Sequence, residues 1–76
     1  MKNYIIYINL YMSKIEAKLK YSPNSFEIVK NGDYVLCSVS KKKIFLEELN
    51  YWNVDLQEPY YSPLEAKIRF EELKDK

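Results

Sequence analysis

The stretch from Gly32 to Asn53 carries the clearest alternation of apolar and polar positions in the chain. Its alternating positions form two sets, which are Val35, Cys37 and Val39 on one side and Tyr34, Leu36 and Ser38 on the other. A repeat of two residues is typical of a β-strand. Three lysines then interrupt the apolar run, which resumes at Ile44. We therefore predict a hairpin whose tip carries Lys41, Lys42 and Lys43.

A second extended run is predicted from Leu49 to Leu56, with Trp52, Val54 and Leu56 on one face. Trp52 is the only tryptophan and the largest single apolar side chain. Aromatic residues of this size dominate small cores. We therefore expect Trp52 at the centre of the fold.

Upstream, residues 15–21 alternate between apolar and charged side chains, which predicts a half-buried strand, although Glu, Ala and Lys also suit a short helix. Ser22–Ser25 has turn composition, and Phe26–Lys30 is a short strand by composition. Asn31-Gly32 is a strong signal for a two-residue type I′ turn. It predicts a hairpin from Phe26 to Val39.

The C-terminal part predicts one helix. After an irregular segment at residues 57–61, Ser62 suits the N-cap, Pro63 the first helical position and Glu65 the closing position of a capping box. The helix is predicted to run from Pro63 to about Lys74. The expected fold is therefore α+β: a small antiparallel sheet of three to five strands with one C-terminal α-helix.

The first 11 residues, MKNYIIYINLY, differ in composition from the residues that come after them. They are too short to span a bilayer and do not fit a signal peptide, so no membrane partner is expected. Two interpretations stay open: an edge strand, or an extension upstream of a start at Met12. The expected organisation is residues 1–11 as extension or edge strand and residues 12–76 as a single small domain.

Composition limits how 76 residues can be stabilised. A core of this size supplies only about 3–5 kcal/mol. One cysteine excludes an internal disulfide, and with no histidine the chain lacks a zinc ligand set, so neither metal nor cofactor is expected. Association with another chain is the remaining way to stabilise so small a core, and we therefore predict a homo-oligomer or a protein partner. The lone thiol favours a reducing compartment, the cytoplasm.

The segments GDYVLCSVS and KKKIFLEELNYWNVDLQEPY, followed by SPLEA, resemble a family of short bacterial proteins of unknown function whose pattern is approximately GDYVxCAVTG…IPLxELRYWSVxxQExY. The resemblance covers about residues 21–69 and implies a fold but no activity. Lys41 replaces the family's usual glycine, and Asn50 its usual arginine. The sequence around Cys37 also resembles half of a zinc-ribbon knuckle, with Ser40 at the position where a second zinc ligand would stand.

Candidate chemistry is sparse. Cys37 could be a nucleophile, but the chain offers no histidine to activate it, and its place between Val35 and Val39 favours a small buried hydrophobe. The pairs Glu47/Glu48 and Glu71/Glu72 diverge in either helix or strand and are expected on a wet surface. Gln57 and Glu58 are expected to bond to neighbouring backbone. No catalytic residues are assigned, and the chain is not expected to be an enzyme.

Two functions are carried forward. The first is a small non-catalytic protein-interaction module that acts through an aromatic-rich surface containing Tyr51, Trp52, Tyr60 and Tyr61. The alternative is an accessory protein for RNA or single-stranded nucleic acid that uses Lys41, Lys42 and Lys43 beside stacking rings. The net charge of +1 argues against the alternative because it gives no long-range attraction to phosphates.

Overall fold

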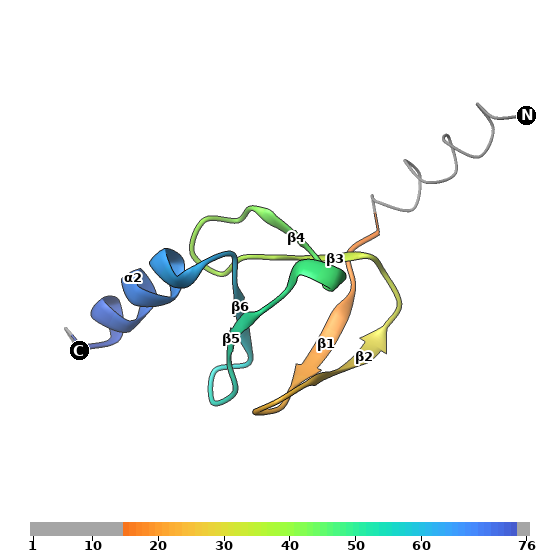
Figure 1. Cartoon of the computed structure of the whole chain (residues 1–76), viewed down its shortest axis with the longest axis horizontal. Helices are drawn as coiled ribbons and strands as arrows, with labels where there is room; N and C mark the ends of the chain where they lie inside the picture. The colour runs from red at the N-terminus through yellow and green to blue at the C-terminus, as the bar shows by residue number, and fades with distance from the viewer. Residues whose placement is uncertain (1–14, 75–76) are drawn as a thin grey trace, which may run out of the picture.

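A computed structural model describes residues 15–74. The elements in order are β1 (Lys18–Tyr21), β2 (Phe26–Lys30), β3 (Tyr34–Leu36), β4 (Lys43–Phe45), the 3-10 helix η1 (Leu46–Glu48), β5 (Tyr51–Asn53), β6 (Glu58–Tyr60) and α2 (Pro63–Lys74) (Figure 1). Consecutive strands pair as three antiparallel hairpins, β1–β2, β3–β4 and β5–β6. The α+β class is confirmed, with three two-stranded sheets instead of one sheet of three to five strands. The alternative starts at Met1 and Met12 lie outside the described residues.

The β1–β2 hairpin follows the predicted alternation. Ala17 and Tyr21 are buried while Lys18 and Lys20 are exposed, as expected for a strand with one wet face. The predicted turn at Ser22–Ser25 is confirmed, because the Ser22 N–H donates to the Ser25 carbonyl at 2.8 Å. The helical alternative for this segment is therefore wrong.

The predicted Asn31-Gly32 hairpin is wrong, because β2 pairs with β1 and β3 pairs with β4. Gly32 does not have a positive φ. Its need for glycine is steric: a Cβ at this position would lie 2.4 Å from the backbone nitrogen of Ala17. The chain crosses itself here, with the Asp33 N–H donating to the Ile15 carbonyl at 3.0 Å.

The hairpin that carries the lysines is confirmed. Val35 pairs with Ile44, and both are buried. β3 ends at Leu36, three residues earlier than predicted, because Ser38–Ser40 form a turn. Lys41 closes this connection with φ at 64°, in the left-handed region that glycine adopts at the least cost.

The prediction for residues 49–61 is wrong in its boundaries. The second extended run stops at Asn53, whose Oδ1 accepts the Leu56 N–H at 2.9 Å and so holds a turn. Gln57 follows at φ 56°, and β6 then returns along β5 through a segment predicted to be irregular. The Gln57 side chain also accepts the Tyr21 N–H and donates to the Tyr21 carbonyl, each at 2.9 Å. The expected structural role of Gln57 is thus confirmed.

The core lies around Cys37, which has no exposed surface. The buried side chains clustered with it are Ala17, Tyr21, Val35, Ile44 and Leu49. Trp52 is only half-buried and packs against this cluster from the side, so its predicted central place is wrong. Its ring stacks on Tyr21 and meets Phe26 edge-on, with centroids 5.8 Å apart in each pair, and its Nε1 donates to the Ser22 carbonyl at 2.8 Å.

Helix α2 spans Pro63–Lys74, as predicted. The Leu64 N–H donates to the Ser62 Oγ at 3.2 Å, and the Ser62 hydroxyl donates to the Glu65 carboxylate. These contacts confirm the N-cap and the pairing of Ser62 with Glu65. The helix extends away from the three hairpins at one end of the molecule (Figure 1).

Candidate interaction surface

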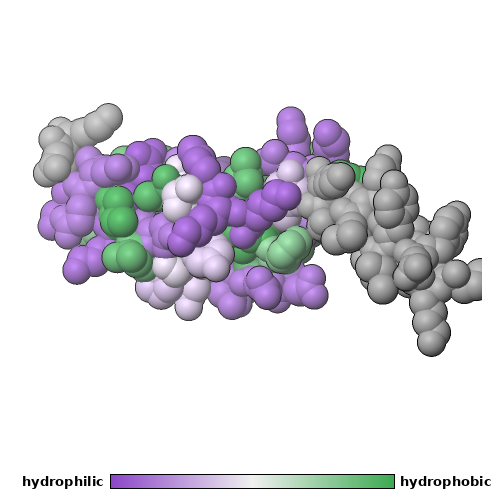
Figure 2. Space-filling view, turned by 90° about the horizontal axis from the view of Figure 1, so that it is seen from above, coloured by the Kyte–Doolittle hydropathy of each residue, from purple (hydrophilic) through white to green (hydrophobic). Residues whose placement is uncertain are grey.

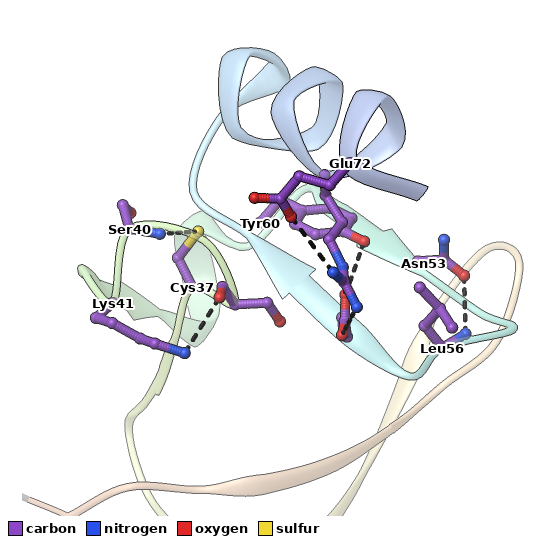
Figure 3. A network of polar contacts seen from close by, with 10 residues as sticks. Cys37, Ser40, Lys41, Asn53, Leu56, Tyr60 and Glu72 are labelled. Atoms are coloured by element: carbon purple, nitrogen blue, oxygen red, sulfur yellow. Dashed lines mark hydrogen bonds and ion pairs between the residues drawn. The ribbon is translucent and has the colours of Figure 1, made fainter. Parts of the chain in front are cut away.

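The three lysines of the β3–β4 connection are all exposed, but each has an intramolecular contact. Lys41 donates from Nζ to the Ser38 carbonyl at 3.1 Å (Figure 3). The Nζ of Lys42 lies 4.8 Å from the centre of the Tyr61 ring. The Nζ of Lys43 lies 4.7 Å from the centre of the Tyr34 ring. Lys42 and Lys43 therefore cover aromatic rings of their own chain.

The four aromatic residues predicted to form the surface differ in how far their side chains are exposed. Tyr60 is 5% exposed, and its hydroxyl donates to the Glu58 carboxylate at 3.1 Å, so its place in an exposed aromatic surface is wrong. Trp52 is half-buried. Tyr51 and Tyr61 are 41% and 46% exposed. Since Tyr51 lies directly opposite Tyr60 on the β5–β6 hairpin, strand register alone cannot separate an exposed from a buried tyrosine here.

Cys37 lies beneath the connection between β3 and β4, which carries the lysines and is called the lysine connection below. Its Sγ accepts the Ser40 N–H at 3.5 Å (Figure 3). Burial alone would raise the pKa of the thiol, but hydrogen bonds from Ser40 and from the backbone at Tyr61 and Val39 lower this pKa below its ordinary value. The sulfur nevertheless has no exposed surface for a substrate to reach. The predicted role of Cys37 as a buried core residue is confirmed.

Polar side chains link β6 to α2. Arg69 binds the Glu58 carboxylate through Nε and Nη2, at 3.1 and 3.2 Å, and Glu72 through Nη1 at 3.3 Å. Figure 3 shows this network beside α2, with Tyr60 and Glu72 labelled. Both carboxylates raise the pKa of the guanidinium. Because a bidentate pair fixes orientation as well as distance, the network sets how α2 lies on the hairpin.

A groove of about 300 Å³ lies between α2 and the β5–β6 hairpin. Apolar side chains form much of its wall: Trp52, Val54, Tyr60, Ala66, Phe70 and Leu73. Phe70 is 62% exposed and Leu73 is 37% exposed, because the short hairpin covers only part of the helix. Asp55 lies at the groove and has no ion pair among residues 15–74.

The opposite side of α2 carries Leu64 and Ile68, which are 65% and 39% exposed. Apolar side chains are also visible as green patches at the α2 end of the molecule, between hydrophilic residues (Figure 2). The groove residues Val54, Phe70 and Leu73 are called the α2 surface below. Its three residues are grouped around the groove, whereas Leu64 and Ile68 lie apart from it.

The sequence contained part of this signal. Ala66, Phe70 and Leu73 repeat at helical spacing, which indicates a face that packs on the sheet. The pattern does not show that β5 and β6 are only three residues each and leave that face half covered. The alternation predicts a strand face for Val54, which lies instead in the turn beside the groove.

A family model described as an uncharacterized protein conserved in bacteria (DUF2093) matches residues 28–69, more than half of the chain. The chain belongs to this family. The matched segment runs from β2 into α2 and includes the lysine connection, the β5–β6 hairpin and Arg69. The resemblance noted from the sequence is thereby confirmed for this DUF2093 protein. No curated protein and no solved structure matches the chain.

The described part of the chain contains neither a metal-ligand cluster nor a membrane-spanning helix. Within residues 15–74, no three His, Cys, Asp or Glu side chains are grouped so that they could hold a metal ion. No helix in the same range has the length and hydrophobicity needed to cross a membrane.

Proposed function

We propose that this DUF2093 protein is a small, non-catalytic protein-interaction module, and that the α2 surface is its binding face. The observation that carries the proposal is the exposure of Phe70 and Leu73 beside the groove, on a helix with few contacts to the rest of the chain. Burying such a side chain against a partner contributes about 1.5–3 kcal/mol. A few of them would suffice for a stable contact.

The partner that fits is a protein segment that inserts an apolar side chain into the groove and presents a basic group to Asp55. A groove of about 300 Å³ accommodates one large side chain with its neighbours. Arg69 does not oppose a basic partner, since Glu58 and Glu72 balance its charge. This proposal moves the predicted surface from the tyrosines to α2.

The test uses a photo-reactive residue at Phe70 in the native host, with the same residue at the exposed Glu47 of η1 as the matched control. A partner joined only through position 70 is identified by mass spectrometry, purified and titrated with the chain. We expect Phe70→Lys to abolish binding and Glu47→Lys to leave it unchanged. Equal cross-linking from both positions, or full binding by Phe70→Lys, would contradict the proposal.

Nucleic-acid binding through Lys41, Lys42 and Lys43 receives less support. Tyr61 is an exposed ring beside this segment, and Lys42 already lies over it. Lys42 also has a negative neighbour, because it contributes to lowering the pKa of Glu65. A stacking platform needs free rings beside a basic groove. The α2 surface remains the stronger proposal.

A further inference from the structure

Strand β2 has an open edge that the binding face on α2 does not use. Within residues 15–74, β2 pairs with β1 on one side and with no strand on the other. Four of its five residues are exposed, and Ile28 and Val29 are 50% and 68% exposed. An isolated two-stranded hairpin is marginally stable in water, whereas three or more strands with an apolar face are stable. A further strand paired with the open edge of β2 would therefore increase the stability of the β1–β2 hairpin.

The backbone groups at this edge can be assigned from Tyr21. Its N–H and carbonyl both bond to the Gln57 side chain, so they point away from β2. Phe26 lies opposite Tyr21, and residues opposite one another in an antiparallel ladder have the same hydrogen-bonding orientation. Phe26 therefore directs its own N–H and carbonyl toward the open edge. Because the orientation alternates along a strand, Ile28 does the same, and the regular register ends after it at a β-bulge.

We propose that β2 pairs in antiparallel register with β2 of a second copy of this chain, which joins two hairpins into a four-stranded sheet. The two copies are related by a two-fold axis at Ile28, which gives the outward backbone groups of this strand hydrogen-bond partners. The outward N–H and carbonyl of Ile28 then bond to the same groups of Ile28 in the second copy. This surface is independent of the proposed binding face on α2.

Charge complementarity selects this occupant and this direction. β2 has Glu27 near its start and Lys30 at its end. Parallel pairing of two copies would set glutamate beside glutamate and lysine beside lysine, and like charges opposite one another destabilise a sheet. Antiparallel pairing sets the acidic half of each strand beside the basic half of the other. Lys30 pairs with Lys18 and Glu27 with Lys20, so after the register shift that follows Ile28 the two charged side chains of β2 lie on the same face of the strand.

The first experiment is disulfide trapping in the full chain under mild air oxidation. Opposed hydrogen-bonded residues have Cα atoms about 5.5 Å apart, within the range that a disulfide spans. We expect Ile28→Cys to form a covalent dimer. The matched controls are Ile68→Cys on α2 and Glu27→Cys, whose side chain lies on the other face of β2, and both are expected to stay largely uncross-linked. Equal trapping at all three positions, or faster trapping at position 68, would overturn the proposal.

The second experiment needs no substitution and follows amide hydrogen exchange. Glu27 has its N–H in the β1–β2 ladder and is protected at every concentration. The Ile28 amide is expected to exchange fast in dilute protein and slowly in concentrated protein. Exchange at Ile28 that does not change with concentration would overturn the proposal. Slow exchange throughout would mean that a segment of the same chain covers the edge, and fast exchange throughout would mean that the edge stays open.

Discussion

At the scale of single residues, some side chains make the hydrogen bonds to backbone groups that a neighbouring strand makes elsewhere. Gln57 is the clearest case, because its amide group satisfies the N–H and carbonyl of Tyr21 as a neighbouring strand would. A buried backbone group without a partner costs about 1–3 kcal/mol. One side chain thus connects the β5–β6 hairpin to the end of β1.

A substitution at Lys41 tests the left-handed backbone conformation of the lysine connection. Its φ of 64° costs a residue with a Cβ about 1–2 kcal/mol, part of which glycine loses again through its freedom in the unfolded chain. We expect Lys41→Gly to raise the free energy of unfolding by about 0.5–1 kcal/mol, measured by denaturant titration.

Lys42→Gly is the matched control for this substitution, because Lys42 has no positive φ. It should lower stability, both through the unfolded state and through the lost contact with Tyr61. If Lys41→Gly lowered stability as much as Lys42→Gly does, the left-handed conformation of Lys41 would be refuted.

At the scale of elements, signals that act within a few residues were the most reliable. Ser62, Pro63 and Glu65 fixed the start of α2 because capping uses side chains next to the helix end. The alternation of β1 and of β3–β4 was also sufficient, since each strand has one buried face. These elements required no knowledge of distant contacts.

The errors arose where a local pattern had two physical explanations. Asn31-Gly32 suits a type I′ turn, but Gly32 is required by the close approach of Ala17, which is 15 positions earlier in the chain. The turn before β6 contains no glycine, because Asn53 and Gln57 hold it by side-chain hydrogen bonds. The exposure of the candidate site depended on these turns. The predicted aromatic surface was therefore wrong at Tyr60, which is buried, whereas Tyr51 and Tyr61 are exposed.

The start of α2 gives a pH-dependent prediction. The hydrogen bond from Ser62 lowers the pKa of Glu65 below its ordinary value of 4.5, although burial opposes this. A carboxyl group whose pKa is lower in the folded state contributes stability above its unfolded pKa, and this contribution is lost as the pH falls through the folded pKa. We expect the stability difference between the unchanged chain and Glu65→Gln to be largest near neutral pH and to shrink below about pH 4.5.

Thermal unfolding over this pH range measures the difference. Glu71→Gln is the matched control, because Glu71 is exposed and makes no hydrogen bond or ion pair among the described residues. A stability difference for Glu65→Gln that grew in acid would contradict the role given to the pair of Ser62 and Glu65.

At the scale of the whole molecule, three short hairpins pack around a core that contains a single cysteine, and helix α2 lies outside this core against β5 and β6. This core does not extend under the outer half of β2 or under the outer turns of α2, where Val29 and Phe70 are mostly exposed. The two uncovered regions differ in kind, because one is a strand edge and the other an apolar groove. We propose that the strand edge takes a second copy of this chain and that the groove takes another protein.

Sedimentation velocity of the unmodified chain, from low micromolar to millimolar concentration, tests the central claim most directly. The claim is that the apolar surface left uncovered by this small core is completed by association. We predict a sedimentation coefficient that rises with concentration from the value of one chain toward that of two. A single-chain coefficient at every concentration would contradict the account.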